Sequence, residues 1–186
     1  MVSIVALWLP ILLSAVFVFI VSSIIHTVLT YHFKDFKAVP GEEKLMAEVR
    51  ALDVPPGEYL APCPRTPQER KTPEFQEKMK KGPILFMTVL GGEAGSMTKN
   101  LVQWFLYAVI VGIFAAYVAG RALGPGAHYL AVFRFVGVTA FACYTVAQWQ
   151  DAIWFNRSMG RTLRNTFDGL IYALLTAGTF GWLWPQ

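Results

Sequence analysis

Three histidines are the side chains best suited to binding a metal ion or a haem, and their spacing separates them. His26 and His32 stand near the end of an apolar N-terminal stretch, and His128 opens another apolar stretch much further along. Six positions along one continuous α-helix turn a side chain by about 240°, so His26 and His32 would face different directions. His128 falls at the opposite membrane surface in the topology derived below. The sequence therefore predicts neither a metal site nor a haem site.

Asp168 is the acidic residue that directly precedes an apolar run. It follows Asn165 by three positions and comes just before the run 169–185, which is typical of a helix start with a cap and an acidic first turn. In the alternative interpretation, Asp168 belongs to a polar cluster that binds a cation or a proton. That cluster would also contain Gln148, Gln150, Asp151 and Asn156. These residue types do not specify a particular ion.

The sequence carries no recognised catalytic motif. Cys63 lies in a polar segment and Cys143 in an apolar one, so we expect neither a disulfide nor a thiolate metal cluster. Phosphate-binding glycine loops, nucleophile elbows and zinc signatures are missing from the sequence. The sequence thus predicts no catalytic residue, no metal and no cofactor.

The composition excludes an ordinary water-soluble domain. Of the 186 residues, 55% are hydrophobic and 15% are charged, whereas soluble domains carry roughly 25% charged residues. The mean hydropathy is +0.45. Although the pI is about 9.1, the basic residues flank apolar runs, which gives no support for nucleic-acid binding. The sequence predicts a small integral membrane protein.

Four apolar runs are candidates for crossing the membrane, which takes about 20 residues of helix. Residues 1–33 contain no charged side chain and supply the first span; the others are 101–120, 128–148 and 169–185. A cleaved signal peptide would need a basic start and a shorter apolar core. We expect an all-α membrane protein, a four-transmembrane-helix bundle. Residues 34–98 would form a small cytoplasmic cap of short helices, with room for one short β-hairpin.

The distribution of basic residues orients this bundle. Fourteen of the 16 Lys and Arg residues lie in 34–99 and in 157–164. Because cytoplasmic loops carry the excess of basic residues, these segments belong inside and both termini outside. The aromatic residues at the ends of the spans agree with this orientation.

The cap segment shows several local signals. Residues 42–52 have apolar side chains at helical spacing. A second helix is predicted between Thr72, as its N-cap, and Gly82, as its C-terminal glycine, with Pro73 in the first turn. Residues 58–61 predict a short strand, and 84–90 either pair with it or lie at the membrane interface. About fifty residues are too few for an independent core, so we expect the cap to dock on the bundle or on another subunit.

Four arginines are candidates for contacts with lipid or with a partner. Arg157, Arg161 and Arg164, in the predicted basic loop 152–167, share one face if that loop is helical. They either fix the topology or bind anionic lipid headgroups at the inner face. Arg134 lies within the third span, where an ionisable residue is a functional hypothesis by default. It either snorkels to headgroups or contacts a partner.

Small residues repeat every four positions in two of the spans. Such stripes let helices approach closely in a membrane. They either pack the spans of one chain together or join separate copies. Their members are Gly112, Ala116 and Gly120 in the second span, and Gly169, Ala173, Ala177 and Gly181 in the fourth.

The last third of the chain also resembles a known family. The segments 165–172 (NTFDGLIY) and 176–185 (TAGTFGWLWP) are similar to a family of small bacterial integral membrane proteins, as are 57–59, 82–83 and 112–126. The resemblance implies a bacterial cytoplasmic membrane and four helices. It brings no catalytic residues, because no activity is established for that family.

These observations favour a non-enzymatic accessory or scaffold protein that acts through helix packing and its cytoplasmic cap. Self-association or a larger membrane complex is the expected setting, with membrane lipids as further partners. A small transporter or channel subunit is the alternative, and it would need polar residues around a cavity near the membrane midplane. A third interpretation is a membrane enzyme that acts on lipid near Asp151 and Asp168.

Overall fold

The computed structural model describes residues 1–91 and 96–186, and 69% of the chain is helical. Two compact units are present. The first, called here the helical unit, comprises Met1–Lys37 and Thr98–Gln186; the second, called the small unit, is Ala38–Met97.

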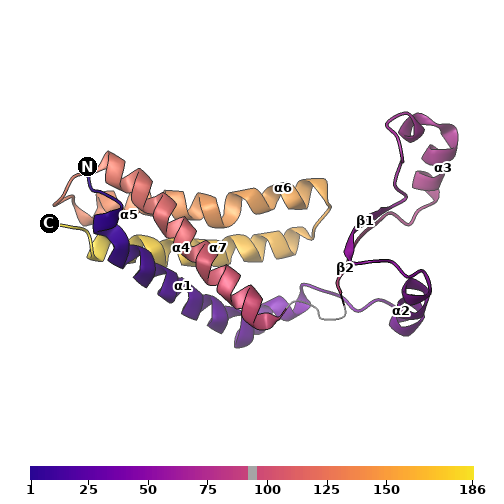
Figure 1. The fold of residues 1–186 in the computed structure, drawn as a ribbon, viewed down its shortest axis with the longest axis horizontal. Coiled ribbons are helices and arrows are strands. Elements are labelled where there is room, and N and C mark those ends of the chain that lie inside the picture. Colours follow the sequence, from indigo (N-terminus) through magenta and orange to yellow (C-terminus); the bar gives the residue numbers. More distant parts are fainter. Residues whose placement is uncertain (92–95) are drawn as a thin grey trace. The chain divides into compact units, whose positions relative to one another are not determined.

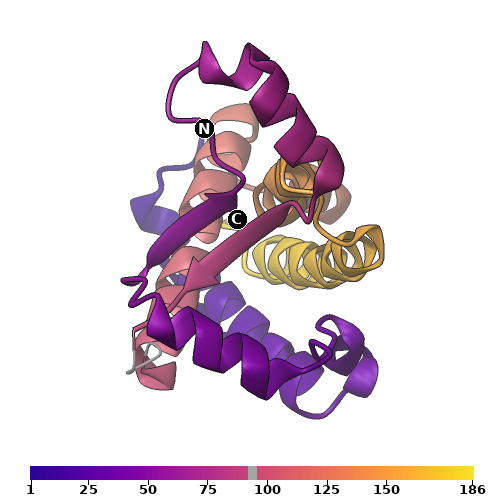
Figure 2. The same cartoon turned by 90° about the vertical axis from the view of Figure 1, so that its right-hand side faces the viewer.

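The helical unit is built from long helices (Figure 1). After a short 3-10 turn at Val5–Leu7 come α1 (Trp8–Thr27) and, much later in the chain, α4 (Met97–Ala122). Then α5 (Tyr129–Phe141) continues through a π-helical segment (Ala142–Val146) into α6 (Ala147–Trp154). The last helix, α7 (Met159–Trp182), runs beside α5 and α6 and also packs against α1 (Figures 1 and 2).

Three helical segments are long and apolar enough to cross a membrane: Val5–Thr27, Met97–Ala122 and Tyr129–Trp154. At 1.5 Å per residue, the shortest of them reaches roughly 34 Å, against about 30 Å of hydrocarbon. The predicted fourth span, 169–185, falls in α7, which is not among these segments. Helix α7 has a comparable length but carries Arg161, Arg164 and Asp168.

The predicted basic loop 152–167 is wrong in its extent. Helix α6 continues to Trp154 and α7 already begins at Met159, so only residues 155–158 connect them. The residues from Met159 onward form the first turns of a long helix, with Ser158 at its N-cap position and the Arg161 and Arg164 side chains partly exposed on it.

Both chain termini lie at one end of the helical unit, beside the α4–α5 connection (Figure 1). The Val2 amide donates to the Gly120 carbonyl at 2.8 Å, and the Gly126 amide donates to the Pro185 carbonyl at 2.8 Å. The Trp184 indole donates to the Gly124 carbonyl at 2.9 Å. These bonds close that end of the bundle.

The small-residue stripes face other helices of the same chain. A Cβ on Gly112 would lie 3.3 Å from Ile11, and one on Gly120 would lie 2.5 Å from the Val2 carbonyl oxygen. In α7, Gly169 faces Thr145 of the π-helical segment and Gly181 faces Tyr129. Ala116, Ala173 and Ala177 are buried between them. The two stripes therefore contact different neighbours and do not face each other.

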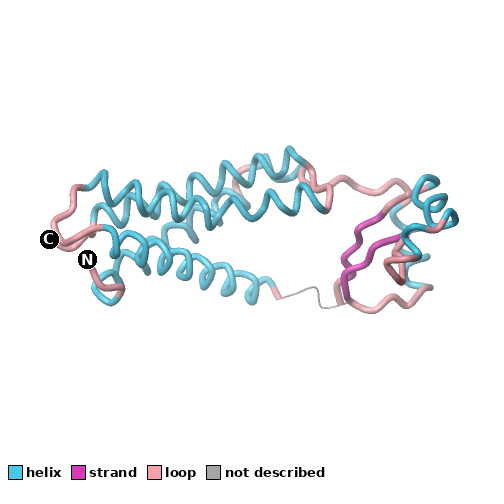
Figure 3. Tube along the Cα trace, turned by 90° about the horizontal axis from the view of Figure 1, so that it is seen from above, coloured by secondary structure: helices cyan, strands magenta, loops and turns pink. Residues whose placement is uncertain are grey.

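The small unit contains two short helices and a two-stranded antiparallel sheet (Figure 3). Strand β1 (Gly57–Ala61) pairs with β2 (Leu85–Val89), so of the two alternatives left open for residues 84–90 the structure has the strand pairing. The predicted helices are also confirmed, as α2 (Glu42–Ala51) and α3 (Pro73–Lys81). Thr72 caps α3 by accepting from the Phe75 amide. Among the described residues of this unit, Phe75 is the one buried hydrophobic side chain.

Candidate functional site

The chain leaving α1 turns back toward α7, and this turn overturns the expectation that His26 and His32 face apart. Helix α1 ends at Thr27, Leu29 is extended, and a 3-10 helix follows at Thr30–Lys34. The His26 and His32 rings consequently stack, with centroids 4.6 Å apart and planes 9° apart.

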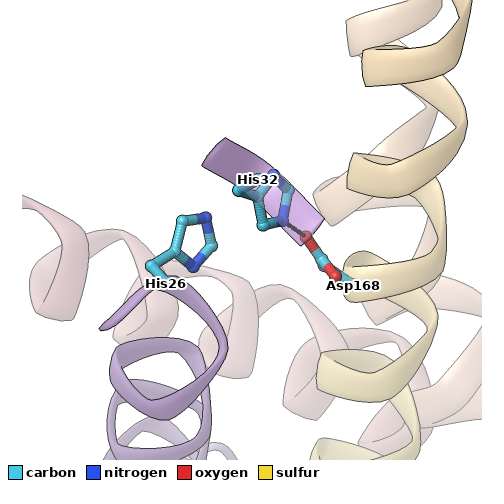
Figure 4. Close-up of side chains that lie close together, drawn as sticks. All are labelled: His26, His32 and Asp168. Carbon is cyan, nitrogen blue, oxygen red and sulfur yellow. Dashed lines mark hydrogen bonds and ion pairs between the residues drawn. The ribbon is translucent and has the colours of Figure 1, made fainter. Parts of the chain in front are cut away.

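Asp168 lies inside α7 and is buried, so its prediction as a helix cap is wrong. The cap position is Ser158, far earlier in the chain. One carboxylate oxygen, Oδ2, accepts a hydrogen bond from His32 Nε2 at 2.7 Å (Figure 4). The other, Oδ1, accepts from the Tyr31 hydroxyl. The last helix is thereby joined to the segment that follows α1.

Asp35 extends the same set of hydrogen bonds. Its Oδ2 accepts from His32 Nδ1 at 2.7 Å, and its Oδ1 accepts from Arg164 Nε at 2.9 Å and from Arg164 Nη2. Five side chains thus form one connected set, called here the His32 network. Its members are Tyr31, His32, Asp35, Arg164 and Asp168.

Burial and hydrogen bonding act on the titration of this network in opposite directions. The side chains of Asp35 and Asp168 are only 7% and 4% exposed. Burial by itself raises the pKa of the Asp35 carboxyl, but the hydrogen bonds from His32 and Arg164 and the Arg164 charge outweigh it, so the pKa lies below its ordinary value. Burial and the bond to Asp168 raise the pKa of the Tyr31 hydroxyl. Both effects keep Asp35 ionised and Tyr31 neutral.

A cavity of about 330 Å³ opens beside the network. His26, His32, Asp35 and Asp168 line it, and further walls come from Phe36, Trp104, Gln148, Arg161, Asn165 and Tyr172. An adjoining cavity of about 270 Å³ shares Trp104, Gln148, Asn165 and Tyr172. Of the polar cluster considered from sequence, Gln148 lines the cavity beside Asp168, whereas Asp151 and Asn156 are exposed elsewhere.

His26, His32 and Asp168 are also the group within the described residues that could hold a metal ion. Each offers one ligand atom, and these atoms lie within 4.8 Å of one another. His128, by contrast, caps α5 at the other end of the helical unit, where its Nδ1 accepts from the Leu130 amide.

The candidate arginines have four different surroundings. Arg164 pairs with Asp35, and the Arg161 guanidinium lies 4.7 Å from the centroid of the Phe36 ring. Arg157 precedes α7 and is exposed, so the predicted three-arginine helix face does not exist. Arg134 is exposed on α5, and in the described part of the chain it makes no hydrogen bond or ion pair.

Tyr31 and Asp35 were not predicted from the sequence as site residues. A signal was present, since ionisable residues at the end of a span require partners. His32 and Asp35 stand three positions apart after the first span, and Arg164 and Asp168 stand four apart before the last. Two such pairs at the same end of a bundle can satisfy each other.

The fold and the apolar lengths of its helices are those of a helical membrane protein. Comparison with protein-family models, with curated proteins and with solved structures finds no match to this chain.

Proposed function

We propose that this chain is a non-enzymatic accessory or scaffold protein of a bacterial cytoplasmic membrane, working in an oligomer or a larger membrane complex. In this proposal the helical unit anchors the protein in the lipid. The small unit is held at the inner face, where it contacts partner proteins. Arg134 and Arg157, exposed and without intrachain partners among the described residues, contact lipid headgroups or a partner.

Four crossings with both termini outside complete the proposal. Helix α7 packs along α5 and α1, and the residues that follow it are hydrogen-bonded to the α4–α5 connection. The segments that leave from the other end of the helical unit carry most of the basic residues. The positive-inside rule therefore supports a cytoplasmic position for the small unit and for the α6–α7 connection.

The observation that carries the scaffold proposal is that the described residues of the small unit bury a single hydrophobic side chain, Phe75. No residue of α2 is buried, and its apolar side chains Leu45 and Met46 are exposed, as is Leu52 just after it. A unit of this size buries little apolar surface by itself, and apolar residues gathered on one helix face are typical of an interaction surface. We infer that this face of α2 binds a partner subunit.

The His32 network supports the same role from the membrane side. It joins residues 31–35, the last part of the helical unit before the small unit begins, to Arg164 and Asp168 of α7. Because buried ionic bonds of this kind are costly to break, the chain leaves the bundle from a fixed point.

The experiment compares complex sizes after gentle detergent extraction from the native membrane. We expect the unchanged chain to migrate well above its own mass of 20.8 kDa plus detergent. Leu45→Glu with Met46→Glu should shift it to the smaller species, whereas Ala47→Glu, on the opposite face of α2, should not. If the unchanged chain already migrates as a monomer, the scaffold proposal is wrong.

A further inference from the structure

We propose that His26, His32 and Asp168 form a binding site for one divalent transition metal ion of the Zn²⁺ class. This inference goes beyond the scaffold role and does not depend on it. It begins from the ligand types, because two imidazoles and one carboxylate are a common donor set for such ions.

The spacing of the ligand atoms fits an ion at this position. His32 Nε2 and Asp168 Oδ2 are 2.7 Å apart, and two ligand atoms that each lie about 2 Å from one ion are separated by about 3 Å. An ion can therefore replace the proton that these two atoms share. His26 completes the set, since its ligand atom lies within 4.8 Å of the others and its ring is exposed.

The hydrogen bonds on the far side of each histidine ring point to the same site. His26 Nδ1 lies 2.9 Å from the Ser22 carbonyl oxygen. A carbonyl only accepts, so Nδ1 carries the hydrogen and Nε2 keeps its lone pair in the neutral ring. His32 Nδ1 likewise faces the Asp35 carboxylate. Metal-binding histidines almost always donate their other N–H to a carbonyl or a carboxylate, and both rings follow this pattern.

The third ligand is oriented in the same way. The Tyr31 hydroxyl holds Asp168 Oδ1, which leaves Oδ2 for the ion, and Arg164 holds Asp35 against His32. Hydrogen bonds hold both ring nitrogens of His32 but only one ring nitrogen of His26. In the described part of the chain His26 Nε2 makes no hydrogen bond, and Figure 4 shows the His26 ring next to His32.

Charge and space are also suitable. Asp35 and Asp168 bring two carboxylates to the site, and the Arg164 guanidinium pairs with Asp35 and not with Asp168. A divalent ion would bind the Asp168 carboxylate in place of the proton on His32 Nε2. The cavity of about 330 Å³ at the same residues leaves a fourth position for water or a small ligand.

The experiment measures Zn²⁺ binding by calorimetry, and Co²⁺ binding by visible absorption, to the full chain in detergent. The protein carries a purification tag without histidines, has Cys63→Ser to remove the exposed thiol, and is first stripped with EDTA. We expect one ion per chain and a higher unfolding temperature with Zn²⁺, since a ligand that binds only the folded state stabilises it.

The variants separate this site from other ligands. His26→Ala should weaken Zn²⁺ binding at least tenfold and leave the metal-free unfolding temperature unchanged, because His26 is exposed. Asp35→Asn, which leaves all three ligands in place, should weaken binding roughly 10- to 100-fold. His128→Ala is the matched control for Zn²⁺ binding: it removes the cap of α5 but should leave the Zn²⁺ affinity unchanged.

Two results would overturn the proposal. One is the absence of stoichiometric Zn²⁺ binding to the stripped protein. The other is binding whose affinity is the same in His26→Ala as in the parent, because the ion then lies elsewhere on the chain. Neither result affects the size of the complex in the detergent extraction experiment, so the scaffold proposal is tested separately.

Discussion

Gly169 allows α7 to approach the π-helical segment, and replacing it with alanine gives the sharpest test of the packing. The new Cβ would lie 2.3 Å from Thr145 Cγ2 and 3.2 Å from Tyr144 Cβ. Thr145 is buried, and its hydroxyl donates to the Phe141 carbonyl at 2.6 Å, so its side chain cannot rotate away without losing that bond. Overpacking of this kind costs about 3 kcal/mol at the upper end.

Part of this cost is offset, because alanine favours helix over glycine by about 1 kcal/mol. The net loss of about 2 kcal/mol corresponds to a decrease in unfolding temperature of roughly 4–8 °C for a chain of this length. The assay is thermal unfolding in detergent followed by tryptophan fluorescence. Gly160→Ala, on the exposed first turn of α7, is the control and should not lower the unfolding temperature.

A second variant identifies the clash itself. Thr145→Ser removes the Cγ2 methyl but keeps the hydroxyl bond to Phe141. In the Gly169→Ala background it should restore most of the lost stability, with a coupling of about 1–2 kcal/mol between the two sites. If Gly169→Ala is as stable as the parent, or if Thr145→Ser does not rescue it, the close approach of α7 to the π-helical segment is wrong.

The remaining predictions concern the network, the termini, the topology and Arg134. Arg164→Ala should lower stability by about 1–3 kcal/mol, because it removes a partner of the buried Asp35 carboxylate; Arg157→Ala, measured in the same unfolding assay, should have no effect. Gly120→Ala should make the N-terminal residues more accessible to proteolysis, because its Cβ meets the Val2 carbonyl. Cys63 is exposed, so a membrane-impermeant maleimide should label it in permeabilised cells but not in intact cells; labelling in intact cells would contradict the orientation. Arg134→Ala should shrink the extracted complex without changing the unfolding temperature, and an unchanged size would exclude Arg134 from the partner contact.

The long helices could be predicted from sequence because apolar runs of this length have few alternatives in water or lipid. The three most apolar segments were found in this way. The local signals in the small unit were also sufficient, since Thr72, Pro73 and Gly82 mark the ends of α3 through their own backbone chemistry. In each case a single segment carried all the information that its structure required.

The site could not be predicted in the same way. His32 and Asp168 are far apart in sequence, and their contact requires α1 to end at Thr27 and α7 to begin at Met159. Both boundaries lie where apolar and polar residues mix, so the hydropathy pattern does not locate them. Moving the start of α7 to Asp168 changes that residue from a buried network member into a cap. Errors in these two helix boundaries therefore removed the whole site from the prediction.

The position of the site follows from a general requirement of such bundles. Ionisable groups that enter the end of a helix bundle must find partners, and partners from the same chain are available only where two helix ends meet. The segment after α1 supplies Tyr31, His32 and Asp35, and α7 supplies Arg164 and Asp168. These side chains could have two roles: they fix the chain where it leaves the bundle, or they orient ligands for an ion. Both roles require that each side chain is held by a hydrogen bond. His26 contributes little to the first of these roles but is necessary for the second, so its substitution distinguishes them.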